Sequence, residues 1–340
     1  MKINTKPLPG MMELLPEEQL EFNRIMSIIQ KNYEKFGFTP IDTPVIERTE
    51  TLLAKAGGET EKQIYRFSKG DNDLSLRFDL TVPTARFVAE NFGQLQFPFK
   101  RSQIGKVYRG ERAQRGRFRE FYQCDIDVIG RGKLSISYDA EVIAVIYNIF
   151  RELNFGDFTL RINNRNITSG LIEGLGLIEK TAEIMSLIDR AEKISTEEFS
   201  KQLANLELGE ESQIISDFIK ISGSAEDVID ELKNLSQKIK NQQFKKGINE
   251  ISEVSELLKI MGVEEKYFKL DMLIVRGLDY YTGTVFETNL NNFKEIGSVS
   301  SGGRYDNLTA NYSKRSLPGV GISIGLSRLF YKLREAGIIN

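Results

Sequence analysis

The chain has 340 residues, of which 40% are hydrophobic and 28% charged, and its formal net charge is −2. This length allows two domains and a sizeable core, whereas the near-zero charge excludes a surface that coats nucleic acid over its whole extent. The chain contains one cysteine, Cys124, and no histidine. These counts exclude an internal disulfide, Ser-His-Asp and Cys-His catalysis, and structural zinc sites.

The N-terminal residues contain no apolar run of signal-peptide length, and no stretch approaches the roughly 20 apolar residues of a membrane span. A lone cysteine fits a reducing compartment. We therefore expect a cytoplasmic protein with no membrane partner. Cys124 lies within a strand pattern, and no histidine is present to activate it. It is therefore expected to be a small buried apolar residue and not a nucleophile.

The first 80 residues predict a helix followed by extended segments. Residues 16–36 form an amphipathic helix pattern whose apolar positions are Leu20, Phe22, Ile25, Ile28, Ile29 and Tyr33. Residues 38–47 are extended because two prolines prevent a second helix, and this helix and segment could pack in the core or form a dimer interface. A short helix at 47–55, a loop at 56–60, and strands at 64–67 and 74–78 around a turn at 69–72 follow.

Three polar residues leave the second of these strands at a spacing of two. Arg77, Asp79 and Thr81 therefore share one face, and Pro83 stands where the next helix begins. A carboxylate and a hydroxyl at the end of a strand would suit a ligand ammonium group. An aspartate that caps the following helix explains the same spacing equally well.

The most unusual stretch is a basic hairpin. Residues 103–109 and 119–129 have strand patterns and flank a polar loop at 110–116, and eight basic residues lie between Lys100 and Arg119. Forked guanidinium groups on a sheet suit capture of phosphate or carboxylate oxygens, and Phe121 offers a face on which a base could stack. The alternative is a basic hairpin that is solvated on one side.

The middle of the chain changes character. A helix at 137–153, a strand at 158–163 and a helix at 166–175 that ends at Gly176 continue the mixed pattern. Residues 178–262 then show helical periodicity in segments 178–192, 195–205, 209–221, 224–240 and 247–261. We expect an inserted helical module there, and it contains no chemical motif.

Strands return after residue 262. Two extended runs are joined through Gly277 and Gly283, with Arg276, Asp279, Tyr280 and Tyr281 clustered between them. Residues 297–305 are glycine-rich, which predicts either a strand that something approaches closely or a tight turn. The chain closes with a strand, Gly325 and a helix that bears Arg328. The Rossmann and Walker patterns are missing from the sequence, so a nucleotide site would be of neither kind.

Taken together, several stretches resemble the class II aminoacyl-tRNA synthetases. FKRSQIGKVYRGERAQRGRFREFYQ resembles their motif 2, PGVGISIGLSRL their motif 3, and the first helix with FTPIDTPVIE their motif 1. RGLDYYTGTVFE and SSGGRYDNL resemble the histidine-specific signatures of the histidyl-tRNA synthetase family, and LRFDLTVPTAR resembles its amino-acid-binding strand. The resemblance covers nearly all of residues 1–176 and 263–340.

The resemblance implies an α+β fold of the class II catalytic type, an antiparallel sheet flanked by helices with a helical insertion. It implies a catalytic core in two parts, 1–176 and 263–340, around an insertion at 177–262, and a homodimer. A full synthetase continues after motif 3 into an α/β anticodon-binding domain. This chain ends at Asn340, so we expect the catalytic core without that domain.

The resemblance also implies the chemistry. L-Histidine and ATP would give histidyl-adenylate and pyrophosphate, and the histidyl group would pass to tRNA(His). Arg109 and Arg276 would be catalytic at the α-phosphate, Arg109 also holding the histidine carboxylate. The other nucleotide contacts implied are Arg117 and Arg328 at the outer phosphates, Phe121 stacked on adenine, and Glu111 near its amino edge. Mg²⁺ would be carried with ATP, and no protein metal ligand is assigned.

Histidine would be bound by a second set of residues. Its ammonium group would be held by Asp79, Thr81 and Gln123, and its imidazole by Asp127, Tyr280, Tyr281 and Tyr305, with Arg276 also at the substrate. Asp79 departs from the glutamate of many family members. The regulatory subunit of ATP phosphoribosyltransferase, a histidine sensor of similar sequence, is the alternative. The phosphate-binding set of Arg109, Arg117, Arg276 and Arg328 favours the synthetase.

Overall fold

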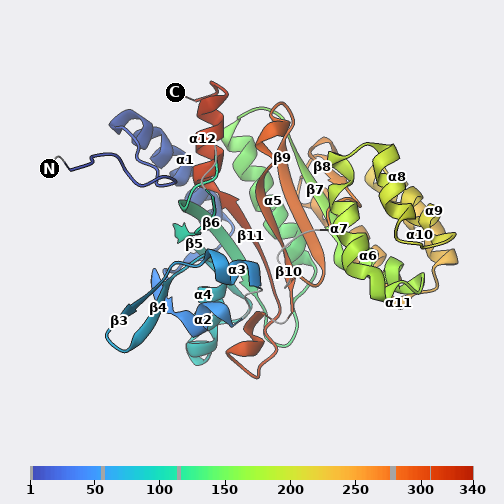
Figure 1. The fold of residues 1–340 in the computed structure, drawn as a ribbon, viewed down its shortest axis with the longest axis horizontal. Helices are drawn as coiled ribbons and strands as arrows, with labels where there is room; N and C mark the ends of the chain where they lie inside the picture. The colour runs from blue at the N-terminus through green and yellow to red at the C-terminus, as the bar shows by residue number, and fades with distance from the viewer. Residues whose placement is uncertain (1–2, 55–57, 113–115, 276–280, 307, 340) are drawn as a thin grey trace.

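The computed structural model describes residues 3–54, 58–112, 116–275, 281–306 and 308–339. Within them the chain forms an eight-stranded sheet, flanked by helices (Figure 1). In spatial order its strands are β1 (Thr39–Pro40), β5 (Phe99–Tyr108), β6 (Glu120–Ile129), β11 (Gly319–Gly325), β10 (Ser298–Tyr305), β9 (Thr284–Leu290), β7 (Phe158–Asn164) and β8 (Phe268–Leu270). All neighbours from β5 to β7 pair antiparallel, and only the edge strands β1 and β8 pair parallel. The predicted antiparallel sheet with flanking helices is confirmed.

The basic hairpin is the longest strand pair of this sheet. β5 and β6 pair without a register shift from Phe99 opposite Ile129 to Tyr108 opposite Glu120. Apolar side chains of β6 alternate with polar ones, so Cys124, Ile126 and Val128 enter the core while the polar residues face the other side. Cys124 is completely buried, as expected.

A second, three-stranded sheet forms from β2 (Ile46–Arg48), β4 (Asn72–Leu76) and β3 (Arg66–Lys69). The predicted hairpin is present, but both strands lie two residues closer to the turn at Gly70, whose φ of 59° suits glycine. The short helices here are α2 (Thr49–Leu53) and α3 (Gly58–Gln63). The second falls on part of the predicted loop, which was therefore too long.

Helices α1 (Pro16–Lys35), α5 (Ser137–Leu153) and α12 (Leu326–Glu335) share one hydrophobic core with the large sheet. α5 ends at Asn154 in the left-handed conformation, as helices commonly do. On α1 the side chains of Phe22, Ile25, Ile29 and Tyr33 are buried. Leu20, predicted on the same face, is 71% exposed. The helix therefore packs in the core, through a narrower stripe than expected.

The helices between residues 165 and 260 lie beyond β7, at the end of the sheet away from β3 and β4 (Figure 1). They are α6 (Arg165–Gly174), α7 (Thr181–Arg190), α8 (Thr196–Ala204), α9 (Glu211–Phe218), α10 (Ala225–Lys238) and α11 (Gln242–Ile260). α11 begins earlier than predicted because the Asn241 side chain accepts a hydrogen bond from the Phe244 N–H and caps it. A Cβ at Gly247 would stand 2.7 Å from the Ile167 backbone nitrogen, so glycine allows α11 to approach α6.

The apolar faces of α10 and α11 continue the core of the large sheet, whereas α7, α8 and α9 pack around a separate cluster that includes Ile184, Phe199 and Ile215. The remaining helix, α4 (Thr81–Glu90), begins at the predicted position before Pro83. None of the helices in the described ranges combines the length and apolar character needed to cross a membrane.

Candidate active site

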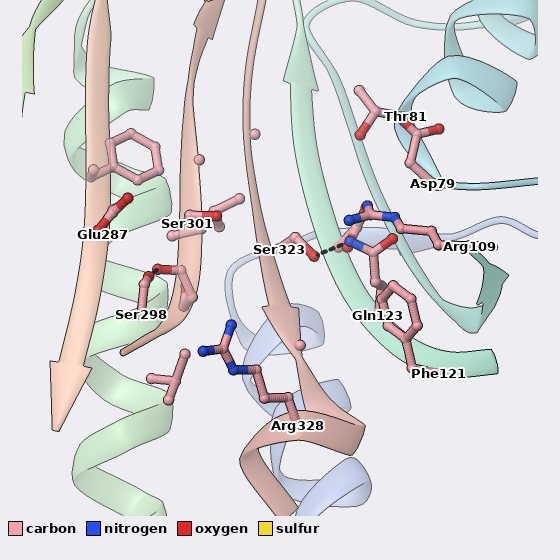
Figure 2. Close-up of a pocket in the computed structure, with 18 of the residues that line it drawn as sticks. Asp79, Thr81, Arg109, Phe121, Gln123, Glu287, Ser298, Ser301, Ser323 and Arg328 are labelled. Atoms are coloured by element: carbon pink, nitrogen blue, oxygen red, sulfur yellow. Dashed lines mark hydrogen bonds between the residues drawn. The ribbon is translucent and has the colours of Figure 1, made fainter. Parts of the chain in front are cut away.

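A cavity of about 420 Å³ lies on the face of the large sheet opposite the core, across β6, β11, β10 and β9 (Figure 2). Side chains also reach it from the segment before α4, from the hairpin loop and from the first turn of α12. It brings together these predicted site residues: Asp79, Thr81, Arg109, Glu111, Arg117, Phe121, Gln123, Asp127, Tyr281, Tyr305 and Arg328. Arg276 and Tyr280, the other two, lie outside the described residues.

The floor of the cavity depends on small residues in β10 and β11. Gly302 and Gly303 lie within β10, between β9 and β11, so the tight-turn alternative for this stretch is wrong. A Cβ at Gly302 would meet the Phe286 ring at 2.5 Å, and one at Gly321 would fall on the Asp127 carboxylate. Gly321 stands opposite Asp127, so glycine there leaves room for Asp127 and for a ligand above the sheet. Gly302 stands opposite Phe286 and Ile322 on the core side, where the missing side chain leaves room for the Phe286 ring.

Asp79 caps the following helix, and its position is also compatible with the ammonium-binding hypothesis. Its Oδ1 accepts a hydrogen bond from the Val82 N–H at 3.0 Å and so caps α4. Its Oδ2 is buried and has no hydrogen-bond partner among the described residues. Burial raises the pKa of Asp79 to about 6, against the backbone hydrogen bond and the nearby Arg109 and Arg101. The open oxygen is available to a cationic ligand.

Arg77, predicted on the same face as Asp79 and Thr81, does not line the cavity. Its guanidinium is 3% exposed and donates to the backbone oxygens of Thr43 and, at 2.9 Å, Lys106. It therefore ties the segment before β2 to β5 and has a structural role.

Asp127 lies at the centre of a buried polar network. The Tyr305 hydroxyl donates to its Oδ1 at 2.8 Å, and Arg101, which is completely buried, forms an ion pair with its Oδ2. Burial raises the pKa of Asp127, while Arg101 and Tyr305 act in the opposite direction. Burial raises the pKa of Tyr305 far above its usual range, so the phenol stays protonated and remains a donor. Sequence reasoning grouped Arg101 with the solvent-facing hairpin charges and missed this partner.

Gln123 and Asp125 stand beside Asp127 on the same face of β6. The Gln123 amide donates to the Ser323 hydroxyl at 2.9 Å, and Ser323 hydrogen-bonds to Asp125 across the β6–β11 pair. Burial raises the pKa of Asp125 to about 7 against the opposing effect of Arg101. Asp125 was not among the predicted site residues. The spacing of two that it shares with Gln123 and Asp127 was the signal that could have found it.

Basic side chains also line the cavity. The Arg109 guanidinium donates to the Phe78 carbonyl at 3.0 Å and lies 5.2 Å from the centre of the Phe121 ring. Arg328 projects from α12 toward β10 (Figure 2) and donates to the Ile296 carbonyl at 2.6 Å. Burial lowers the pKa of Arg328, and the neighbouring charge of Arg117 lowers it further. The positive charges of these two guanidiniums repel each other, and a polyanion bound between them would stabilise both.

The hairpin charges are thus divided. Lys100 pairs with Glu141 and Lys106 with Glu120, at 2.5 and 2.8 Å, outside the cavity. Arg117 pairs with Glu111 at 3.2 Å within it. Part of the hairpin charge is therefore paired outside the cavity. Arg109 and Arg117 line the cavity, where the anion-site hypothesis stays a prediction.

Some lining residues carried no prediction. Glu287 of β9 and Ser298 and Ser301 of β10 face the end of the cavity away from Asp79 (Figure 2). Burial raises the pKa of Glu287. These residues are far from the hairpin in the sequence, and only the sheet order brings them to the same cavity.

The chain is similar to known proteins over most of its length. The family model described as histidyl-tRNA synthetase matches residues 10–329. A histidine–tRNA ligase of Clostridium tetani is 58% identical over 98% of this chain and 75% of its own length. A crystal structure of histidyl-tRNA synthetase from Nostoc sp. PCC 7120 has a TM-score of 0.93 and 43% identity, covering 100% of this chain and 77% of that one.

A third protein shares the fold at lower identity. The structure of an ATP phosphoribosyltransferase regulatory subunit/histidyl-tRNA synthetase from Bacillus halodurans has a TM-score of 0.84 and 23% identity, over 98% of this chain and 84% of that one. The family match and the 58% identity, together with the cavity described above, lead to one conclusion: the chain belongs to the histidyl-tRNA synthetase family.

Proposed function

We propose that this chain is the catalytic part of a histidine–tRNA ligase. It activates L-histidine with ATP, releasing pyrophosphate, and then transfers the histidyl group from the adenylate to tRNA(His). One observation supports this most strongly. Acidic and hydroxyl groups that suit a zwitterionic amino acid, and guanidinium groups that suit phosphates, line the same cavity, with Arg109 beside Asp79 and Arg328 farther along the sheet (Figure 2).

Histidine binds on the side formed by β6 and the start of α4. The open oxygen of Asp79, the Thr81 hydroxyl and the Gln123 amide hold its ammonium group. Asp127 accepts a hydrogen bond from the imidazole, and Tyr281 and Tyr305 line the same pocket. The Tyr305 hydroxyl and Arg101 each engage one oxygen of Asp127. A carboxylate has about four acceptor sites, so capacity for the imidazole N–H remains.

ATP lies against the guanidinium groups of the cavity. Adenine stacks on Phe121 with its amino edge near Glu111, Arg109 contacts the α-phosphate, and Arg117 and Arg328 contact the outer phosphates. Mg²⁺ is carried on those phosphates, as is usual for this ion. The described part of the chain has no group of three or more residues able to hold a metal ion, and we assign it no side-chain ligand.

The reaction follows from this arrangement. A histidine carboxylate oxygen attacks the α-phosphorus, a new P–O bond forms, and the bond to the β-phosphate breaks. The attacking carboxylate is already ionised and needs no general base, which agrees with a chain that has no histidine. Arg109 stabilises the charge that develops on the α-phosphate oxygens. In the second step a hydroxyl of the tRNA 3′-terminal ribose attacks the acyl carbon and AMP leaves.

The test is exchange of label between pyrophosphate and ATP, which reports adenylate formation alone. We expect exchange that depends on histidine and is not supported by other amino acids. Arg109→Ala should lower its rate a hundredfold or more, the usual cost of removing one transition-state donor. Arg24→Ala, which removes an exposed arginine of α1, is the matched control and should leave the rate unchanged.

Two results would contradict the proposal. Exchange with another amino acid and not with histidine would show a different substrate. Histidine binding without exchange would favour the regulatory-subunit alternative, whose solved relative is only 23% identical to this chain. Transfer of labelled histidine to a tRNA(His) transcript tests the second step separately.

We also propose that residues 177–262 are an insertion into a core formed by 1–176 and 263–340, and that the chain is a cytoplasmic homodimer. Val45 and Ile46, in the motif 1 stretch, are 38% and 49% exposed. Such exposure suits an interface with a second copy. Light scattering after size exclusion should give twice the chain mass, and a monomer mass would refute the dimer.

A further inference from the structure

We propose that Asp125 completes the ammonium pocket as a further carboxylate, which is protonated in the empty cavity and loses its proton when a cationic amino group binds. This deepens the function proposed above and rests on it. The proposal makes Asp125 a residue that selects for the charged amino group of the substrate.

The position of Asp125 is the first support for the inference. It lies between Gln123 and Asp127 on the face of β6 that lines the cavity, and its side chain is 3% exposed. Its Oδ1 is buried and has no hydrogen-bond partner among the residues described. Asp79, across the cavity, also presents one buried oxygen without such a partner. The Arg101 guanidinium, whose nitrogens also have no hydrogen-bond partner among the described residues, forms its ion pair with Asp127. A donor that a ligand brings into the cavity would satisfy the open oxygens of Asp79 and Asp125.

The charges around Asp125 are the second support for the inference. The groups that face Asp125 are Arg101 of β5, Asp127 of β6, Ser323 of β11 and Asp79 before α4. Behind it, Tyr33 of α1 donates to the Cys124 carbonyl on the core side of the sheet. Arg101 is already engaged by Asp127. Arg101 also lowers the pKa of both Asp125 and Asp79, and Arg109 lowers that of Asp79. Three buried carboxyls, Asp79, Asp125 and Asp127, therefore share the charge of Arg101, and like charges in one buried site do not all ionise readily.

A proton on Asp125 resolves this imbalance in the empty cavity. Burial raises the pKa of Asp125 to about 7 and that of Asp79 to about 6. The hydrogen bond from the Val82 N–H and the charge of Arg109 favour the ionised form of Asp79, so the proton is assigned to Asp125. An incoming ammonium group replaces that proton. The O–H bond of Asp125 breaks, the proton passes to the buffer, and the carboxylate accepts a hydrogen bond from the ammonium group, so charge and atoms balance.

Calorimetry tests the proton count directly. Histidine is titrated into the chain at pH 7 in buffers of different ionisation enthalpy, and the slope of the observed enthalpy gives the protons released. The difference between the unaltered chain and Asp125→Asn should be about half a proton per histidine at pH 7 and none at pH 9. Asp125→Glu, which keeps a titratable group, should release more than Asp125→Asn. Imidazole lactate, with a hydroxyl in place of the ammonium, should show no such difference.

Affinity provides a second readout. Asp125→Asn should bind histidine roughly tenfold more weakly at pH 8, where the unaltered carboxylate is already ionised. Between pH 6 and 8 the affinity of the unaltered chain should rise relative to the variant. Infrared difference spectra of the unaltered chain should show loss of a protonated carboxyl band when histidine is added, and this measurement requires no variant.

The outcomes separate the two proposals. Histidine binding with equal proton release in the unaltered chain and Asp125→Asn overturns this inference and leaves the proposed function standing. Histidine binding with no loss of a protonated carboxyl band does the same. If the unaltered chain does not bind histidine at all, the proposed function is wrong and this inference falls with it.

Discussion

Arg304, inside the SSGGRYDNL signature, is expected to stabilise the fold and not to contact substrate. Its Nε and Nη2 donate to both oxygens of Asp139, at 2.7 to 3.1 Å, and Nη2 also donates to the Ser135 carbonyl at 2.9 Å. Asp139 is completely buried in the first turn of α5, and Arg304 is 8% exposed. The pair therefore joins β10 to α5 behind the cavity.

Removing one partner of such a pair leaves an uncompensated charge. We expect Arg304→Met to lower the free energy of unfolding by about 3–5 kcal/mol. The matched control is Arg66→Met on β3. Arg66 forms a similar two-pronged pair with Asp73, at 2.7 Å for both bonds, but the two side chains are 56% and 48% exposed. Water replaces the lost partner there, so the control should lose far less.

The loss of stability in Arg304→Met should depend on pH. Burial raises the pKa of Asp139, and Arg304 opposes this effect. Without Arg304 the folded-state pKa rises further above that of the unfolded chain. A group whose pKa is raised in the folded state adds most to the free energy of unfolding at low pH. It loses that contribution as the pH rises through its folded-state pKa. The Arg304→Met defect should therefore be larger at pH 8 than at pH 5.5.

Urea unfolding followed by circular dichroism measures both effects, with the midpoint and slope compared at each pH. The double variant Arg304→Met with Asp139→Leu should recover part of the loss, since no buried charge remains. Equal losses for Arg304→Met and Arg66→Met would refute the argument from burial. A defect of the same size at both pH values would refute the role of the Asp139 charge.

Three further predictions follow from the cavity and the core. Gly321→Ala places a methyl group on the Asp127 carboxylate and should abolish histidine-dependent exchange between pyrophosphate and ATP. Gly93→Ala is the control, because the space around its Cβ is open, and equal exchange rates in the two variants would refute the prediction. Burial raises the pKa of Cys124 well above its usual value, so a thiol reagent should label it only after unfolding; rapid labelling of the native chain would contradict this. Because burial raises the folded-state pKa of Asp125 to about 7, the unaltered chain should lose stability between pH 4 and 7. The ligand-free Asp125→Asn variant should therefore become the more stable of the two across that range by urea unfolding, and parallel profiles would argue against it.

Local patterns in the sequence were enough for much of the fold. The predicted helix at 137–153 matches α5 at both ends, because its apolar positions recur at the helical period. The β5–β6 hairpin follows from alternation and from a polar loop with glycines. The cavity residues came instead from motif resemblance, and every one of them in the described ranges lines one cavity.

Side-chain partners far away in the chain were decided only by the tertiary structure. Arg101 and Arg109 are both hairpin arginines, yet Arg101 is buried against Asp127 and Arg109 faces the cavity over Phe121. Charge and spacing are similar for both residues. They are eight positions apart and so lie on the same face of the hairpin. Their difference depends on where each lies along it, because Arg101 stands opposite Asp127 within β5, whereas Arg109 follows the last paired residue, Tyr108.

Asp125 illustrates the same limit for chemistry. Its position on β6 was readable from alternation, but its raised pKa results from burial, with smaller contributions from Asp127 and Asp79, against the opposing effects of Arg101 and Ser323. Three of these four residues come from other segments of the chain. A pKa depends on burial and on charges within a few ångströms. The order of strands in the sheet places those charges together, and one-dimensional periodicity contains no information about that order.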